Sequence, residues 1–297
     1  MTIRREEPKD YREVESLTRE AFWNVYRPGC TEHFVLNQYR TNPDFIPELD
    51  LVMEEYGKII GHVMFSMAEI ILDDNSQTSG GILPAWTFGP ISIHPNYKRK
   101  GYGLKLLNYA LDKAREMGIG VLCMEGNIDF YRNAGFDLAS KLNIHYHSEP
   151  KDSEVPYFLA QELIHGYLNG IEGTYCPPKG YFVADENPKA FEAYEATFPK
   201  KEKCLKPGQL PQFCQSCGMP LTRDEDCGTN ADGSKNFDFC TYCYKDGAFT
   251  SNFTMEEMAE FCSQFVDEFN KHSGQNLSRE EYKTMLLRFY PNLRRWK

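Results

Sequence analysis

The stretch that decides the fold is Phe88-Gly89-Pro90-Ile91-Ser92-Ile93-His94-Pro95, followed after two residues by Lys98-Arg99-Lys100-Gly101-Tyr102-Gly103. An apolar strand is expected to end here in a basic turn that contains two glycines. Because glycine has no Cβ, such a turn can direct consecutive backbone N–H groups at one anion. The stretch therefore predicts a polyphosphate site, with a plain tight connection as the alternative.

A helix is predicted directly after this turn. Leu104, Leu107, Leu111 and Ala114 recur at helical spacing and form one apolar stripe, while charged residues occupy the other face. The first turn of a helix carries free N–H groups and a partial positive charge. The helix is therefore expected to direct its positive end at the same anion.

The spacing of the glycines does not fit two common phosphate-binding motifs. A Rossmann fingerprint has three glycines, and a P-loop ends in Gly-Lys-Ser/Thr. The segment resembles instead the acetyl-CoA loop of the GNAT-superfamily acetyltransferases, Arg/Gln-x-x-Gly-x-Gly/Ala between a strand and a helix, with Lys98 in place of the first residue. The resemblance implies an α+β fold, a mixed and mostly antiparallel sheet with flanking helices. It also implies cofactor contacts from Lys98, Arg99, Lys100, Gly101, Tyr102 and Gly103.

A second segment extends this resemblance. A buried strand is predicted over 119–124, and the superfamily carries a tyrosine four residues before a Gly-Phe pair, where this chain has Tyr131 and Gly135-Phe136. A phenol is protonated near neutral pH and can give its proton to the departing CoA thiolate. Tyr131 is therefore expected to be the catalytic acid, with a core packing role as the alternative.

Further cofactor contacts follow from the resemblance. In the superfamily the pantetheine arm pairs with the main chain of the strand before the loop, which implies Ile91, Ser92 and Ile93 here. Asn127 can donate and accept hydrogen bonds where the next strand would diverge. It is expected either to bind the cofactor or to be an ordinary turn residue.

The general base is the least defined part of the predicted site. Glu125 ends the second strand of the cleft and is the candidate for this role, while Glu32 and His33 lie in the region that shapes the substrate pocket in the superfamily. An exposed glutamate is most often a solvated side chain. Water is an alternative acceptor of the amine proton.

The cysteines indicate a second domain. Cys214-Gln215-Ser216-Cys217 and Cys240-Thr241-Tyr242-Cys243 form a CxxC pair at the spacing of a zinc ribbon. One structural Zn²⁺ is predicted, with an iron–sulfur cluster or a redox dithiol as alternatives. Cys227 lies between the two pairs and is expected to be a bystander rather than a ligand.

These motifs and the flanking sequence resemble the zinc-ribbon domain family of prokaryotic proteins, including its C-terminal helices. Thr254–Glu257 and Ser278–Glu281 each fit a capping box that starts a helix. The predicted domains are 1–207, an acetyltransferase domain with an extension and linker, and 208–297, a zinc ribbon with a helical tail. Further strands are expected over 138–146, 157–163 and 181–183, and a helix over 188–196.

Composition agrees with a cytoplasmic enzyme. The 297 residues carry a formal charge of −10, which makes a nucleic-acid partner unlikely for this chain. No stretch has the roughly 18 apolar residues of a membrane span. The ten cysteines show no disulfide pattern, which indicates a reducing compartment.

The sequence thus predicts an N-acetyltransferase that transfers an acetyl group directly from acetyl-CoA to an amine of a small molecule or peptide. The acceptor and the oligomeric state are not specified by the sequence. Two alternatives stay open: a regulatory protein that senses CoA and uses its ribbon to contact a macromolecule, and a binding scaffold without activity.

Overall fold

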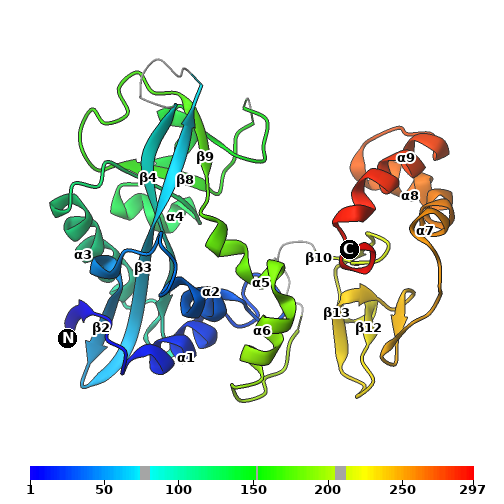
Figure 1. Ribbon diagram of the computed structural model, residues 1–297, viewed down its shortest axis with the longest axis horizontal. Coiled ribbons are helices and arrows are strands. Elements are labelled where there is room, and N and C mark those ends of the chain that lie inside the picture. The colour runs from blue at the N-terminus through cyan, green and yellow to red at the C-terminus, as the bar shows by residue number, and fades with distance from the viewer. Residues whose placement is uncertain (74–80, 152, 205–211) are drawn as a thin grey trace. The chain divides into compact units, whose positions relative to one another are not determined.

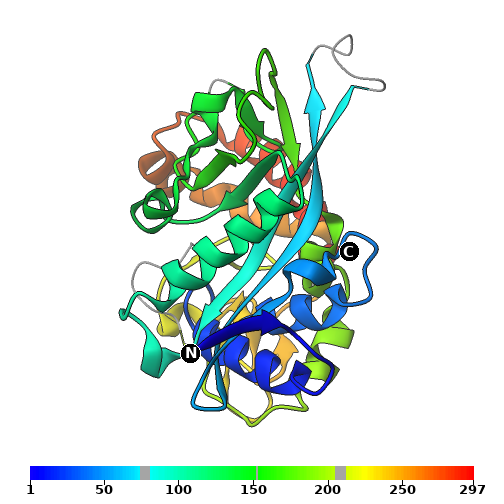
Figure 2. The same cartoon turned by 90° about the vertical axis from the view of Figure 1, so that its left-hand side faces the viewer.

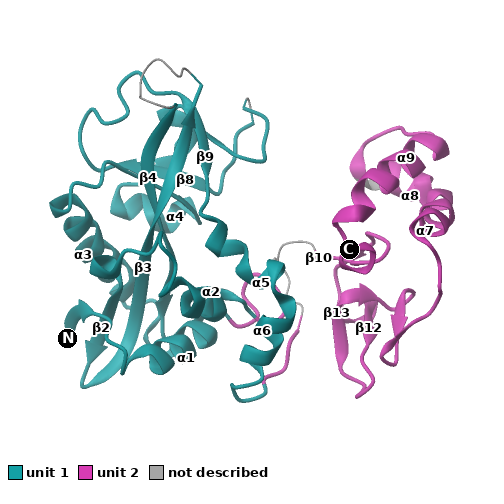
Figure 3. Ribbon diagram, in the orientation of Figure 1, with its two compact units in different colours: residues 1–22, 30–200 teal, residues 23–29, 201–297 magenta. Residues whose placement is uncertain are grey.

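A computed structural model describes residues 1–73, 81–151, 153–204 and 212–297. Two compact units are present, one formed by residues 1–22 and 30–200 and the other by residues 23–29 and 201–297 (Figure 3). The predicted boundary between residues 207 and 208 lies outside the described residues. Within the part of the chain that is described, no helix is both long and apolar enough to cross a membrane.

The first unit is built on a nine-stranded sheet with the order β1-β2-β3-β4-β5-β8-β6, and with β9 and β7 joined to the far half of β3 (Figure 1). Among the strands in the described residues, only the β4–β5 and β7–β9 pairs are parallel, so the sheet is mixed and mostly antiparallel, as predicted. Its strands are β1 (Thr2–Arg5), β2 (Leu51–Glu55), β3 (Lys58–Leu72), β4 (Ile82–Ile93), β5 (Val121–Glu125), β6 (Asp137–Leu138), β7 (Ile144–Tyr146), β8 (Phe158–Glu162) and β9 (Gly173–Cys176).

Helices cover both faces of this sheet. The α-helices of the unit are α1 (Tyr11–Phe22), α2 (Glu32–Tyr39), α3 (Tyr102–Glu116), α4 (Ile128–Tyr131), α5 (Val183–Glu186) and α6 (Pro188–Glu195). The stripe of α3 packs with Val63, Phe65 and Phe88, whereas α1 and α2 pack with Val52 and Met64. Alternate residues of a strand point to opposite faces. Figures 1 and 2 accordingly show α3 on one side of the long strands and α1 with α2 on the other.

The predictions of strands over 138–146 and 181–183 are wrong. Residues 138–146 do not form one strand, because a 3₁₀ turn over Ala139–Leu142 separates β6, which pairs with β8, from β7, which pairs with β9. Residues 181–183 form the end of a 3₁₀ turn (Lys179–Phe182) and the start of α5. A short apolar run does not distinguish a strand from a helical turn, and here packing on α2 decides.

The second unit contains three short hairpins and a helical tail. Its strands are β10 (Gln212–Phe213), β11 (Pro220–Leu221), β12 (Cys227–Thr229), β13 (Lys235–Cys240), β14 (Tyr244–Lys245) and β15 (Ala248–Phe249), and its helices are α7 (Met255–Cys262), α8 (Val266–Ser273) and α9 (Arg279–Phe289). Both predicted capping boxes are confirmed, at the starts of α7 and α9. The C-terminus docks on the ribbon, because Trp296 Nε1 donates to the carbonyl of Ser216 at 2.8 Å.

A buried charge network joins β3 to the residues that follow β1 and α2 and to the residue that precedes β2 in the first unit. Arg40 donates to both carboxylate oxygens of Glu6 at 2.8 and 2.9 Å, and His62 Nε2 lies 2.7 Å from Asp50 Oδ1. Burial is the main cause that raises the pKa of Glu6 to about 7 and lowers the pKa of His62 to about 4. Between about pH 4.5 and 6.5, the folded protein therefore has a protonated Glu6 and a neutral His62. In the unfolded chain at the same pH, Glu6 is ionised and His62 carries the proton.

This exchange of a proton predicts how two variants respond to pH. The raised pKa of Glu6 makes the unfolding free energy fall as pH rises from about 4.5 to 7, and the lowered pKa of His62 makes it rise between about 4 and 6.5, so the two effects oppose each other. We expect His62→Gln to expose the first dependence, a loss of about 1–3 kcal/mol from pH 5 to 7 relative to wild type. Glu6→Gln should show the opposite slope. Urea unfolding across this range is the measurement, and parallel curves for His62→Gln and wild type would contradict the assignment.

Candidate active site and metal centre

The site begins where β4 separates from β5. The two strands share a single registered pair, Trp86 with Leu122. Opposite the single residue Met64 of β3, β4 carries the two residues Gly89 and Pro90, because Phe88 pairs with Phe65 and Ile91 with Val63. A bulge of this kind bends a strand. From Trp86 onward, therefore, β4 leaves β5 and opens one of its edges.

The open edge of β4 carries backbone groups. The N–H of His94 donates to the carbonyl of Ile60 at 2.9 Å, so alternation turns the N–H and C=O of Ile91 and Ile93 away from β3. The Ser92 hydroxyl donates to Thr18 Oγ1 at 3.1 Å, on the face of the sheet that α1 covers. An extended ligand arm between β4 and β5 can therefore pair with Ile91 and Ile93, whereas Ser92 pairs with β3 and α1.

The turn after β4 places backbone donors at the start of α3. Arg99 and Gly101 have φ values of 61° and 80°, and Gly101 precedes the first residue of the helix. The first-turn N–H groups of a helix have no partner within the helix. A Cβ on Gly103 would lie 3.4 Å from the Phe130 ring and 3.6 Å from Ile93, which is ordinary contact, and its φ is not positive. Neither backbone strain nor crowding within the protein therefore requires glycine at position 103. A ligand bound beside this position is the remaining reason for a glycine.

The basic side chains of the turn have separate surroundings. Lys98 Nζ donates to the carbonyl of Ala21 at the end of α1, at 3.0 Å. Lys100 Nζ lies 5.2 Å from the centre of the Tyr97 ring, and the Tyr102 hydroxyl donates to Glu55. Lys98, Arg99 and Lys100 are exposed. Lys98 thus binds the end of α1, while its predicted contact with the cofactor stays a prediction.

Tyr131 lies at the end of α4, directly after β5. Its ring is half-buried and packs on Phe88 and Phe136, with ring centres 5.9 Å apart in both pairs. A Cβ on Gly126 would lie 2.3 Å from the Tyr131 ring, so glycine is needed there for this ring position. Tyr131 therefore has both the packing contacts of a core residue and a position beside the divergence of β4 and β5.

Asn127 and Glu125 occupy the loop and strand end before α4. Asn127 caps α4, because its Oδ1 accepts from the N–H of Asp129 at 2.8 Å. This is the turn role that the sequence left open, and it leaves the exposed amide group for a ligand. Glu125 is exposed and its Oε1 accepts from the Tyr146 hydroxyl at 2.6 Å. The sequence did not indicate Tyr146, because this residue of β7 is distant from Glu125 along the chain and reaches it only when the sheet has formed.

His33 is positioned for a structural role. It is fully buried, and its Nε2 lies 2.8 Å from the Glu195 carboxylate, which also pairs with Arg19. Glu195 is on α6, so this cluster attaches α6 to α1 and α2. We conclude that His33 is not available as a base.

The four predicted cysteine ligands meet at one point of the second unit. The ligand atoms of Cys214, Cys217, Cys240 and Cys243 all lie within 4.8 Å of one another. The Sγ atoms of Cys217 and Cys240 are 3.8 Å apart. Zn–S bonds of about 2.3 Å in a tetrahedron give S···S edges of about 3.8 Å. The donor set therefore fits a four-thiolate zinc site.

Each knuckle is shaped by a hairpin. β10 pairs with β11 around the first CxxC, and β14 pairs with β15 just after the second. Gly218 and Gly247, with φ of 77° and 86°, make the turns. The N–H of Cys240 donates to Cys214 Sγ at 3.2 Å, a bond that stabilises a thiolate.

Two other cysteines lie close to this group. Cys227 Sγ donates to the carbonyl of Arg223 at 3.7 Å and is not a member of the four-sulfur group, as expected. Cys262 of α7 lies beside Cys217, and its thiol donates to Met258 Sδ at 3.7 Å. The sequence gave no signal for this contact, because Cys262 has no CxxC partner.

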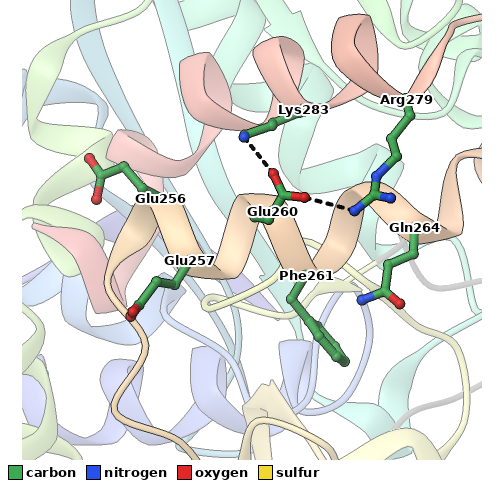
Figure 4. Close-up of a pocket in the computed structure, with 7 residues that line it drawn as sticks. All are labelled: Glu256, Glu257, Glu260, Phe261, Gln264, Arg279 and Lys283. Carbon is green, nitrogen blue, oxygen red and sulfur yellow. Dashed lines mark hydrogen bonds and ion pairs between the residues drawn. The ribbon is translucent and has the colours of Figure 1, made fainter.

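A surface hollow between α7 and α9 is separate from these sites (Figure 4). Glu260 in its centre binds Arg279 at 2.7 Å and Lys283 at 2.5 Å. The charges in its centre are therefore paired with each other and join the two helices.

Comparison with known proteins identifies both parts of the chain. Residues 11–136 match the family described as "Acetyltransferase (GNAT) family", and residues 213–297 match "Putative zinc ribbon domain". An N-acetyltransferase of Escherichia coli K12 named YhbS, described as uncharacterized, is 25% identical over 174 residues, which are 58% of this chain and 93% of that protein.

A solved structure shares the fold of the first unit. The crystal structure of YhbS from Escherichia coli in complex with CoA aligns with a TM-score of 0.51 and 23% identity, over 61% of this chain and 91% of that one. A GNAT acetyltransferase from Brucella melitensis in complex with acetyl-CoA aligns at 0.47 and 23%, over 61% and 97%.

Proposed function

Because this chain contains a domain of the GNAT acetyltransferase family and a zinc ribbon domain, we propose that it is an N-acetyltransferase that uses acetyl-CoA and acts on an amine. The observation that carries the proposal is the open edge of β4, which leads into the glycine turn and the first turn of α3. The E. coli relative was solved with CoA, which supports the same cofactor here.

The proposed binding mode follows from the backbone. Ile91 and Ile93 pair with the pantetheine amides, and the backbone N–H groups of 99–104 bind the pyrophosphate at the positive end of α3. Arg99 and Lys100 add charge beside it, and Asn127 contacts the arm from the β5 side. Transfer is direct: the amine nitrogen attacks the acetyl carbon, Glu125 accepts a proton from the amine, and Tyr131 gives one to the departing sulfur.

The proposed Zn²⁺ is structural. Four thiolates saturate a tetrahedral ion, so no coordination position is left for a substrate. The short hairpins of the ribbon bury few apolar side chains, and a metal bound only by the folded state would stabilise them. The same proposal places the protein in a reducing compartment such as the cytoplasm, because none of the ten cysteines forms a disulfide.

The experiment that tests the proposed activity is a screen of amines with acetyl-CoA, read by release of free CoA and by the mass of the acetylated product. Turnover with an amine supports an enzyme. CoA binding without release of free thiol for any amine would favour a sensor of CoA.

The first prediction from this mode concerns Gly103. We expect Gly103→Val to lower CoA affinity at least tenfold, about 1.4 kcal/mol, because its side chain fills the space beside the pyrophosphate. Calorimetric titration with CoA measures this. Gly103→Ala should unfold at nearly the wild-type temperature, since its Cβ has room. Lys98→Ala should lose less affinity, and an unchanged CoA affinity for Gly103→Val would refute the cradle.

The second prediction concerns Tyr131. Tyr131→Phe keeps the ring contacts with Phe88 and Phe136 but removes the proton donor. We expect kcat to fall roughly 10²–10⁴-fold with little change in CoA binding. Wild-type turnover in this variant, measured with any amine that the screen identifies, would leave Tyr131 with a packing role only.

The third prediction concerns the metal. Elemental analysis of the full chain should give one zinc per chain, and Cys217→Ser should lose it and unfold the ribbon, whereas Cys227→Ser should keep it. A chain of residues 1–207 should still bind CoA. Zinc clearly below one equivalent, or a folded 1–207 chain that does not bind CoA, would contradict the respective half of this prediction.

A further inference from the structure

The carboxylate of Glu125 lies among tyrosines that come from distant parts of the chain. Leu122 and Met124 of β5 pack in the core under α3, while Cys123 packs on the opposite face with Phe158 and Tyr175. Alternation along the strand puts Glu125 on the face of Cys123. This is the face that the helices α1 and α2 cover farther along the sheet.

Aromatic rings lie on one side of the Glu125 carboxylate. The Tyr146 hydroxyl donates to Glu125 Oε1 at 2.6 Å. The Tyr146 ring is also nearly perpendicular to the Tyr157 ring, with centres 5.9 Å apart and an angle of 82°. Tyr157 is 43% exposed, and Glu125 is exposed as well. A small molecule can therefore reach both the carboxylate and an aromatic face.

The bulge of β4 forms the other side. Tyr181 donates from its hydroxyl to the carbonyl of Gly89 at 2.8 Å, and Ser66 Oγ lies 3.5 Å from the same hydroxyl. Gly89 is in the part of β4 that has left β5. The tyrosine that fixes this part of β4 and the carboxylate at the end of β5 thus lie on the two sides of the divergence.

Carboxylates are the charged groups that act on these tyrosines, and the His147 ring lies 4.7 Å from the Tyr146 ring. Burial raises the pKa of Tyr146, Tyr157, Tyr175 and Tyr181, and the Glu125 charge raises each of them further. The phenols therefore stay neutral. The carboxylate charges that act on Tyr146 and Tyr157 are those of Glu125 and Glu149. Such a site repels a carboxylate of the acceptor and attracts a cation.

We propose that the acceptor is a cationic primary alkylamine without a carboxylate of its own, whose ammonium group binds Glu125 beside the rings of Tyr146 and Tyr157. Ammonium groups are attracted to the faces of aromatic rings as well as to carboxylates. This inference rests on the proposed N-acetyltransferase function and narrows its substrate class.

The reaction of such an amine balances without another reactant. The ammonium gives one proton to Glu125, the nitrogen forms a bond to the acetyl carbon, and the carbon–sulfur bond breaks. The sulfur takes a proton from Tyr131, which recovers one from the newly formed amide nitrogen. Glu125 then releases its proton to water, so one proton is liberated for each acetyl group transferred.

Two amines of equal chain length test the inference: 1,6-diaminohexane and 6-aminohexanoate. With the full-length protein and acetyl-CoA, kcat/KM should be at least tenfold lower for 6-aminohexanoate than for the diamine. Tyr157→Leu should lower kcat/KM for the diamine about threefold to tenfold through loss of the ring face. Equal use of the anionic amine and the diamine would overturn the inference.

A binding measurement distinguishes a failure of this inference from a failure of the proposed function. Calorimetry with 1,6-diaminohexane and the CoA-saturated protein should detect binding that Glu125→Gln weakens at least fivefold. Glu69→Gln, which removes an exposed carboxylate of β3, is the matched control and should bind as wild type. Absence of diamine binding to wild type, or full binding by Glu125→Gln, overturns the inference. Binding of the diamine without acetylation supports the subsite and counts against the enzyme.

Discussion

The candidate site of the first unit depends on the separation of two parallel strands, β4 and β5. Backbone N–H and C=O groups that are removed from water need partners. In β4 the groups of Ile91 and Ile93 face away from β3, and β5 is registered with β4 only at Trp86 and Leu122. An edge of this kind can be paired by a strand, by water or by a ligand with amides. The bulge at Gly89 and Pro90 lies beside this open edge, in the interior of the sheet and away from its edge strands β1 and β6.

The rest of the site is arranged around this open edge. The glycine turn and α3 follow at its end, so the positive end of a helix lies next to the open backbone. Tyr131 and Glu125 follow from β5 on the other side. The second unit is held in a different manner, by four thiolates brought together by hairpins. One unit thus depends on a packed apolar core, while the ribbon of the other depends on a metal in addition to its helices.

Local patterns in the sequence were enough to predict much of this. The strand–turn–helix around Gly101, the two CxxC motifs and the capping boxes depend on neighbouring residues, and the structure contains them as predicted. The 138–146 segment was wrong because its two halves pair with different strands. Tyr146, Tyr175 and Tyr181 were missed around Glu125, and Cys262 around Cys217, because these contacts form only when separate segments fold together. Short-range spacing carries no information about them.

The measurement that tests the central claim most directly is backbone hydrogen exchange of the full-length protein with and without CoA. If the open edge of β4 and the first turn of α3 hold the cofactor, the amides of Ile91, Ile93 and residues 99–104 will exchange more slowly when CoA is bound. The amides of the zinc ribbon will be unaffected. Unchanged exchange at residues 91–104, with protection elsewhere in the chain, would contradict the account.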